Sequence, residues 1–289
     1  MAAVVSASGC ASTPGDTCTR DDQCASHFCK ADDTCAPAAD GPLGGPDGSQ
    51  QQPDAPLGCA PNHDGTITRA EIPLAAGQSA KFRIATSATV DTAGALGTDG
   101  TRAWTLAAAL ANDSDAQVAL ESPSGQWWAS DFPNATYATL LSSQQDLRGV
   151  FLVDDAGLHL LGIVSPTGGV TRTELTYDPP VDVLRFPLTT TSKWTSSPTV
   201  SGYASGVPGA YTESYDSKVD AVGTMATPYG TFPVMRVAVD FQQTTTVVTT
   251  HKTYAWVSEC YGTIATVTSQ NYETKSDFTK ASEVWRLAP

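Results

Sequence analysis

The sequence predicts a mainly β protein, in which an antiparallel sheet forms a sandwich or a half-open barrel. Threonine, which favours half-buried strands, occurs 38 times in 289 residues. Charged residues make up only 16% of the chain, against about a quarter in typical soluble domains, which disfavours solvated helices. From Cys59 onward, strand-like stretches alternate with turn signals at short intervals. Such spacing favours consecutive antiparallel strands.

The clearest predicted strand covers residues 235–241, where apolar residues occupy every second position and would share one face. We expect turns at 122–125 and 146–149, and short helices at 106–112 and 136–147. Further strands are expected at residues 81–85, 104–106, 151–153, 158–164, 183–186, 200–204, 218–225, 246–257, 261–268 and 283–287.

Composition divides the chain into four segments. Residues 1–9 are interpreted as the remnant of a lipoprotein signal peptide, and residues 10–35 as a disulfide-rich knot. Residues 36–58 contain five prolines and show no periodicity, which predicts a disordered linker. Residues 59–289 form the antiparallel β domain, and a division of this domain into halves 59–180 and 181–289 stays open.

The seven cysteines indicate an oxidising compartment outside the cytoplasm. Cys10 follows the small residues Ala7, Ser8 and Gly9, and this string resembles a bacterial lipobox, in which the cysteine is lipidated. We therefore expect Cys10 to anchor the protein to a membrane. The alternative is a free thiol in a disordered tail.

The next four cysteines lie in a polar segment with almost no apolar residues to bury, so cross-links would have to hold its shape. Of the three pairings, we favour Cys18 with Cys29 and Cys24 with Cys35. A zinc site is the alternative, although short Cys-x2-Cys spacings are missing. Cys59 and Cys260 would then join the two ends of the β domain.

The net charge of −14 argues against nucleic acid as a partner, because a polyanion would be repelled. No segment approaches about 18 consecutive apolar residues, so we expect membrane contact only through the lipid on Cys10. The expected location is tethered to the outer membrane, in the periplasm or on the cell surface.

Residues 62–71 are similar to the second half of an EF-hand calcium loop. Asn62, Asp64 and Glu71 occupy ligand positions, with Gly65 at the turn. The first ligand position falls on Ala60, which has no side-chain oxygen, so we expect no cofactor beyond weakly bound calcium. The alternative is a simple tight turn at Asp64 and Gly65.

The sequence contains no recognisable catalytic motif, and we expect no enzymatic activity. There is no His-x3-His pair and no Gly-x-Ser-x-Gly elbow. His159 lies in an apolar run, which favours a core imidazole over a catalyst. At Trp127 and Trp128, one ring is expected in the core, and the other either stacks on sugar rings or is covered.

Two blocks in the second half of the chain resemble a pattern of exported bacterial β-proteins. The first runs from Tyr177-Asp178-Pro179-Pro180 through Phe186-Pro187-Leu188 to Trp194. The second is the string Thr227-Pro228-Tyr229-Gly230-Thr231-Phe232 followed by Arg236-Val237. Both are similar to the DUF3108 and TapB-like group, across residues 177–268. The resemblance implies an antiparallel, LolA-like curved sheet and brings no activity with it.

These observations favour a non-enzymatic envelope or cell-surface lipoprotein. The knot and linker would form a stalk, and the β domain would bind an unidentified lipid or hydrophobic molecule, glycan or protein. An extracellular hydrolase and a purely structural envelope protein are the alternatives. An open apolar cavity would favour ligand binding.

Overall fold

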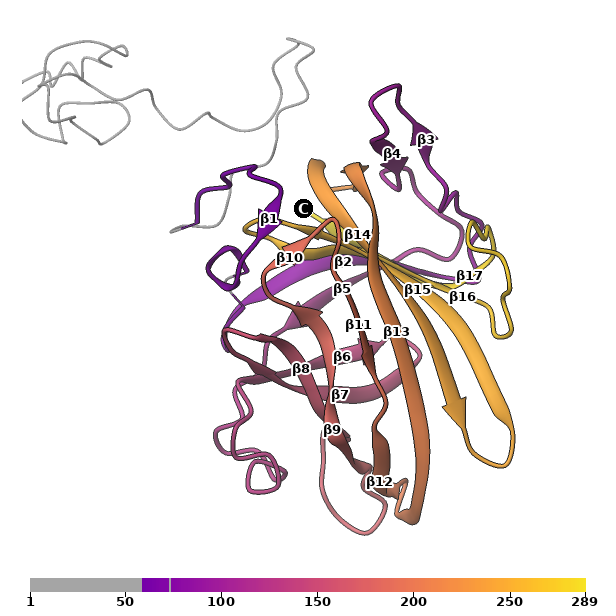
Figure 1. The fold of residues 1–289 in the computed structure, drawn as a ribbon. Helices are drawn as coiled ribbons and strands as arrows, with labels where there is room; N and C mark the ends of the chain where they lie inside the picture. Colours follow the sequence, from indigo (N-terminus) through magenta and orange to yellow (C-terminus); the bar gives the residue numbers. More distant parts are fainter. Residues whose placement is uncertain (1–58, 73) are drawn as a thin grey trace, which may run out of the picture. The chain divides into compact units, whose positions relative to one another are not determined.

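A twelve-strand antiparallel sheet, nearly closed into a barrel, makes up most of the fold (Figure 1). The computed structural model describes residues 59–72 and 74–289. The mainly β fold class is therefore confirmed, in its half-open barrel form. One 3-10 helix, η2 (Arg69–Glu71), is the only helix among these residues. No described helix has the length and apolar character to cross a membrane.

Most strands follow one another along the chain with short connections. The strands are β1 (Thr66–Ile67), β2 (Ser79–Thr86), β3 (Ala95–Leu96), β4 (Arg102–Thr105), β5 (Ser114–Ala119), β6 (Tyr137–Ser142), β7 (Gln145–Val153), β8 (Gly157–Val164), β9 (Glu174–Arg185), β10 (Leu188–Thr189), β11 (Lys193–Ser196), β12 (Thr199–Ala204), β13 (Val207–Ala226), β14 (Thr231–Thr244), β15 (Val248–Ser258), β16 (Gly262–Ser269) and β17 (Ala281–Ala288). Longer segments link β5 to β6 and β16 to β17.

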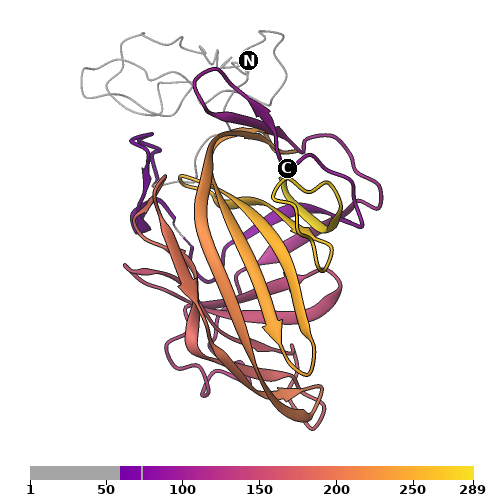
Figure 2. The ribbon, with the colours of Figure 1, turned by 45° about the vertical axis from the view of Figure 1, so that its right-hand side comes forward.

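The barrel runs in the order β5-β2-β17-β16-β15-β14-β13-β12-β9-β8-β7-β6. In Figure 2 the long strands β13 to β15 lie in front of the wall that contains β6 and β7. The two end strands, β5 and β6, meet only beside a bridge between Glu121 and Ala138, which exchange backbone hydrogen bonds of 2.7 and 2.9 Å. We call this junction the seam.

Strands from both ends of the domain share this one sheet. β2 pairs with the C-terminal strand β17, in the register Phe82 opposite Leu287 and Ile84 opposite Trp285. Residues 59–180 and 181–289 therefore do not form separate sheets, and the described residues lie in one compact unit.

Alternation along each strand separates the barrel interior from an outer layer. On β14, Met235 and Val237 belong to the interior cluster, whereas Val234 belongs to the outer cluster. The predicted two-faced strand at 235–241 is thus confirmed, because successive side chains point to opposite faces of a sheet.

One part of the interior is occupied by a cluster of buried side chains, and we call it the filled half. Its buried residues come mainly from β8, β9 and β11 to β14, and Trp194 lies among them. The Trp194 indole N–H donates to the carbonyl of Asp182 at 2.7 Å, so burial leaves this polar group satisfied. The other members include Leu160, Leu175, Tyr177, Val181, Leu184, Val200, Val219 and Val237.

Two buried arginines attach residues 87–113 to the outside of the barrel. Arg236 forms a bidentate ion pair with Asp220 at 2.8 and 2.9 Å, and its guanidinium lies over the rings of Trp104 and Tyr254. Arg286 is fully buried and pairs with Asp113. Burial lowers the pKa of Arg286, and the attraction of Asp113 opposes that shift.

Both predicted helices are wrong. Residues 137–142 and 145–153 are the strands β6 and β7, and residues 106–112 are irregular. The predicted turn at 146–149 lies inside β7, while the actual turn precedes it at Ser143 and Gln144. Neither segment has a continuous apolar helical face, so pairing with neighbouring strands decides the conformation. The longer predicted strands are all present.

Candidate functional site

A disulfide between Cys59 and Cys260 joins the two ends of the β domain, as the sequence predicted. It closes a loop with a sequence separation of 201 residues. Beside it, the Glu259 carboxylate accepts hydrogen bonds from the backbone N–H groups of Asn62 and His63, at 2.9 and 3.0 Å. We call this junction of Cys59–Cys260 with the Glu259 hydrogen bonds the clasp. It is therefore both covalent and hydrogen-bonded. Cys10 and the pairs Cys18–Cys29 and Cys24–Cys35 lie outside the described residues.

The calcium-like segment forms a compact turn. Asn62 and Asp64 lie close together, with 2.9 Å from the Asp64 backbone N–H to the Asn62 amide oxygen, and Gly65 has a positive φ of 82°. The Glu71 carboxylate instead accepts from the Thr68 backbone N–H and hydroxyl, both at 2.8 Å, as the capping group of η2. Among residues 59–72 and 74–289, no three His, Cys, Asp or Glu side chains could together hold a metal. Calcium binding stays a prediction.

His159 lies on β8 between two carboxylates. Its ring nitrogens are 2.7 Å from Asp182 and 3.2 Å from Asp154. Burial works against the charge on Asp154, but hydrogen bonds from the Ala156 N–H, His159 and the Gly157 N–H lower its pKa. Both ring nitrogens are thus engaged by carboxylates, which leaves neither facing a hydroxyl or thiol nucleophile.

The two adjacent tryptophans are both largely covered. Trp128 is buried at 1% exposure and meets Phe132 edge to face, with ring centroids 6.2 Å apart. The Trp127 indole N–H donates to the Ser165 carbonyl at 3.1 Å, and its ring lies beside Gly168. A covered ring, rather than a sugar platform, is what this geometry supports at Trp127.

A cavity of about 680 Å³ lies inside the barrel. Its wall comes mainly from β2, β5, β6, β16 and β17, so it borders the seam on both sides. We call this region the hollow half. Ligand cavities in proteins typically enclose about 300–1,000 Å³, and this one falls within that range.

The wall of the cavity is mostly apolar. Phe82 and Trp285 meet edge to face with centroids 5.8 Å apart, and Tyr137 stacks on Phe151 at 5.3 Å. Burial raises the pKa of Tyr137 well above its ordinary value, so the phenol is neutral. Leu141 and other aliphatic side chains complete this surface. Such a wall suits the hydrocarbon part of a ligand.

Threonines form a second part of the wall. Thr253 and Thr268 lie on adjacent strands with their hydroxyl oxygens 3.3 Å apart, and Thr263 and Thr266 are their neighbours in the cavity. On the opposite side of the cavity, the buried hydroxyl of Thr139 has no hydrogen-bond partner. A buried polar group without a partner costs free energy, so a ligand group that bonded Thr139 would recover it.

Among the described residues, Glu283 is the only acidic one in the cavity wall. Its side chain lies on β17 and is 9% exposed. One carboxylate oxygen, Oε1, accepts from the Ser143 N–H at 2.8 Å and from the hydroxyls of Ser143 and Ser142 at 2.6 and 3.2 Å. The turn between β6 and β7 therefore holds the carboxylate in a fixed orientation at the cavity.

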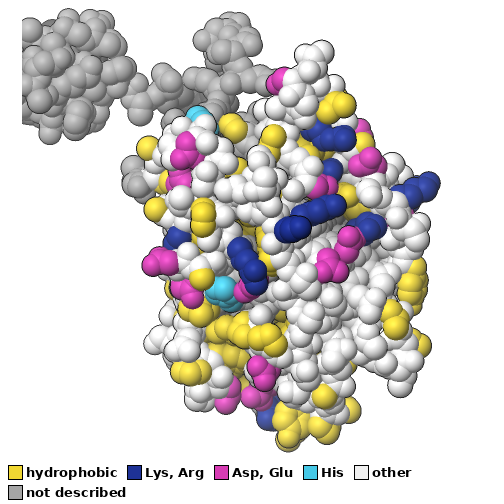
Figure 3. Space-filling view, viewed as in Figure 1, with side chains coloured by type: hydrophobic (Ala, Val, Ile, Leu, Met, Phe, Trp, Pro, Cys, Tyr) yellow, Lys and Arg dark blue, Asp and Glu magenta, His cyan; other side chains and the backbone are white. Residues whose placement is uncertain are grey.

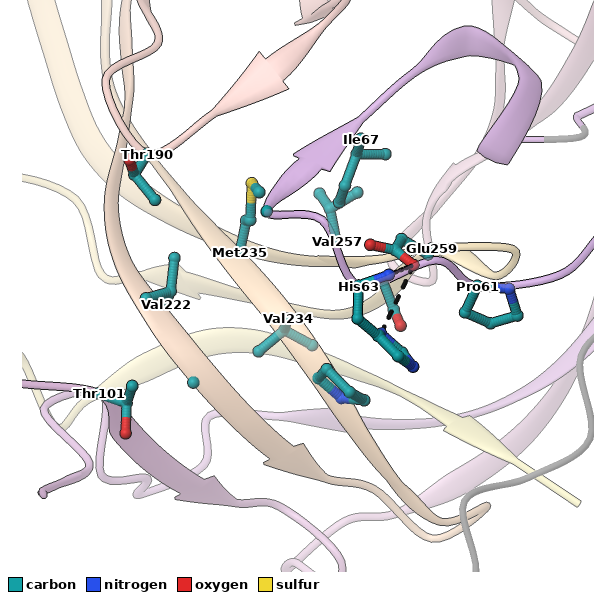
Figure 4. Close-up of a pocket in the computed structure, with 14 residues that line it drawn as sticks. Pro61, His63, Ile67, Thr101, Thr190, Val222, Val234, Met235, Val257 and Glu259 are labelled. Carbon is teal, nitrogen blue, oxygen red and sulfur yellow. Dashed lines mark hydrogen bonds and ion pairs between the residues drawn. The ribbon is translucent and has the colours of Figure 1, made fainter. Parts of the chain in front are cut away.

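A smaller pocket of about 290 Å³ lies next to β1, over Val222, Val234 and Met235 (Figure 4). Its two titratable side chains, His63 and Glu259, interact with each other. His63 and Glu259 approach to 3.6 Å, and Glu259 also holds two backbone N–H groups. On the face shown in Figure 3, basic and acidic side chains are interspersed over a largely uncharged surface.

The chain matches no family model, no curated protein and no solved structure in the comparisons. The similarity to the DUF3108 and TapB-like group therefore stays a prediction.

The sequence motifs did not identify the residues of the hollow half. Residues 283–287 were predicted as a strand, and alternation places Glu283, Trp285 and Leu287 on one face. The signal in the sequence that could have indicated this site was an acidic residue on the same strand face as a tryptophan and a leucine. Closure of the barrel then turned this face inward.

Proposed function

We propose that this protein is a non-enzymatic, exported binding protein that holds a hydrophobic small molecule inside its barrel. The apolar cavity of about 680 Å³ carries the proposal. It has the size, concavity and lining of a ligand site, with a few polar groups on an apolar wall. The partly open seam lies directly beside it.

The Cys59–Cys260 disulfide supports export, because such cross-links persist in oxidising compartments. Attachment to a membrane through lipidated Cys10 is the part of this proposal that rests on sequence alone. The engaged nitrogens of His159 support a binding role over hydrolysis.

The test is binding of the neutral fluorescent probe N-phenyl-1-naphthylamine to the full chain. We expect fluorescence enhancement with the wild type and its loss in Thr266→Trp, because Thr266 lines the cavity and the indole would fill it. Thr212→Trp, at an exposed position of β13, is the matched control and should bind as the wild type does. Circular dichroism would show that both variants are folded. Undiminished binding by folded Thr266→Trp, or none by the wild type, would contradict the proposal.

A further inference from the structure

The hollow half contains a carboxylate whose charge no basic residue balances. Glu283 is more than nine-tenths buried, and no Lys, Arg or His of residues 59–72 and 74–289 lines the cavity with it. Within the described part of the chain it forms no ion pair, and only Oε1 is hydrogen-bonded. The second oxygen, Oε2, is left as an acceptor at the cavity.

A second interior glutamate shows what a satisfied carboxylate looks like in this barrel. Glu213 lies in the filled half at 6% exposure. Its Oε2 accepts from the Tyr215 hydroxyl at 2.5 Å, and its Oε1 accepts from the Gln243 amide at 3.1 Å. Both oxygens of Glu213 are thus used within the protein. Of these two glutamates, Glu283 alone keeps an oxygen without a hydrogen bond among the described residues, and Glu283 alone lines the large cavity.

Three donors compensate Oε1, whereas Oε2 has none among the described residues, and a buried charged oxygen without a partner is costly. A cationic group brought in by a ligand would provide that compensation at Oε2. The aromatic rings of Trp285 and Phe82 lie in the same wall, and ring faces also attract cations. An anionic head group would instead be repelled by the carboxylate.

We infer that the ligand class is a cationic amphiphile, with a protonated amine at Glu283 and a hydrocarbon body against the apolar wall. This inference rests on the proposed function and names its ligand. It selects against fatty acids, although their chains would suit the same wall. Neutral alcohols can donate one hydrogen bond but carry no charge. Their affinity should lie between that of the cationic amphiphiles and that of the fatty acids.

The experiment is competition against N-phenyl-1-naphthylamine on the full chain at neutral pH, with dodecylamine, 1-dodecanol and dodecanoate below their micelle concentrations. All three probes share one chain length, so they differ mainly in the head group. We expect dodecylamine to displace the fluorophore at a concentration about tenfold or more below that of dodecanoate, as a charge-assisted hydrogen bond implies. This comparison uses only the wild type and does not depend on any variant folding.

Glu283→Gln should abolish the preference for dodecylamine while leaving fluorophore binding intact. Glu213→Gln is the matched control, because it removes an interior charge with no oxygen at the cavity, and it should retain the preference. A purely structural role for Glu283 would show as lower thermal stability with an unchanged order of the probes. That result, or equal displacement by all three probes in the wild type, would overturn the inference and leave the proposed function standing. Absence of fluorophore binding to the wild type would overturn both.

Discussion

The two halves of the barrel interior have the same strand alternation but opposite packing. In the filled half, large side chains such as Trp194 and Tyr177 meet in one cluster, and its acid, Glu213, has both oxygens paired. In the hollow half, threonines replace many of the large residues, and Glu283 keeps one oxygen unpaired. One side of the barrel is thus filled by side chains, and the other side encloses a cavity.

The filled half also shows how burial acts on titratable groups without creating a site. Burial raises the pKa of Tyr211 to about 12 and raises the pKa values of Tyr177 and Tyr215 further. The Tyr215 hydroxyl donates to Glu213, so the buried phenol and the acid satisfy each other. Shifted pKa values therefore do not distinguish the two halves, whereas the spare oxygen of Glu283 does.

The largest expected effect on stability comes from removing the clasp. Its Cys260 borders the cavity of the hollow half. Cys59→Ser combined with Cys260→Ser opens a loop of about 200 residues, and chain entropy predicts a loss of up to about 5 kcal/mol in the free energy of unfolding. Urea denaturation of the double variant measures it and leaves the other cysteines in place. A loss below about 1 kcal/mol would show that the hollow half does not depend on the cross-link.

A second prediction contrasts truncation in the two halves. Trp194→Ala should lower the free energy of unfolding by about 4 kcal/mol, because it leaves a void in a packed cluster. Leu141→Ala should cost about 1 kcal/mol, since this half-buried side chain already faces open space. Thermal and urea unfolding of both variants give the comparison. Equal losses would mean that the hollow half is as tightly packed as the filled half.

The smallest expected effect is the pH dependence contributed by His251, which stacks on Phe241 with ring centroids 4.3 Å apart. Burial lowers the pKa of His251 below its ordinary value of 6.5. Below about pH 6.5 the unfolded chain therefore takes up a proton that the folded protein does not, so the stability from neutral His251 is lost as the pH falls toward the folded pKa. His251→Phe should flatten the stability curve in that window. An unchanged slope between pH 7 and pH 5 would contradict this assignment.

Much of the fold was accessible from local patterns. The alternation at 235–241, the threonine content and the turn spacing predicted an antiparallel sheet, and pairing of the remaining cysteines predicted Cys59–Cys260. Residues 136–147 were misassigned to a helix because their apolar residues follow neither period clearly. Their conformation as part of the β6–β7 hairpin depends on pairing with β8 and on the rest of the barrel.

The sequence by itself determined the β class, the alternating faces of the strands and the identity of the clasp, because these follow from local residue preferences and cysteine chemistry. Only the tertiary structure decided that the sheet nearly closes at Glu121 and Ala138, and that Glu283 faces an open cavity while Glu213 meets Tyr215. The physical reason is that strand order and barrel closure join residues far apart in the chain, and local patterns do not specify which face becomes the interior or how fully it is packed.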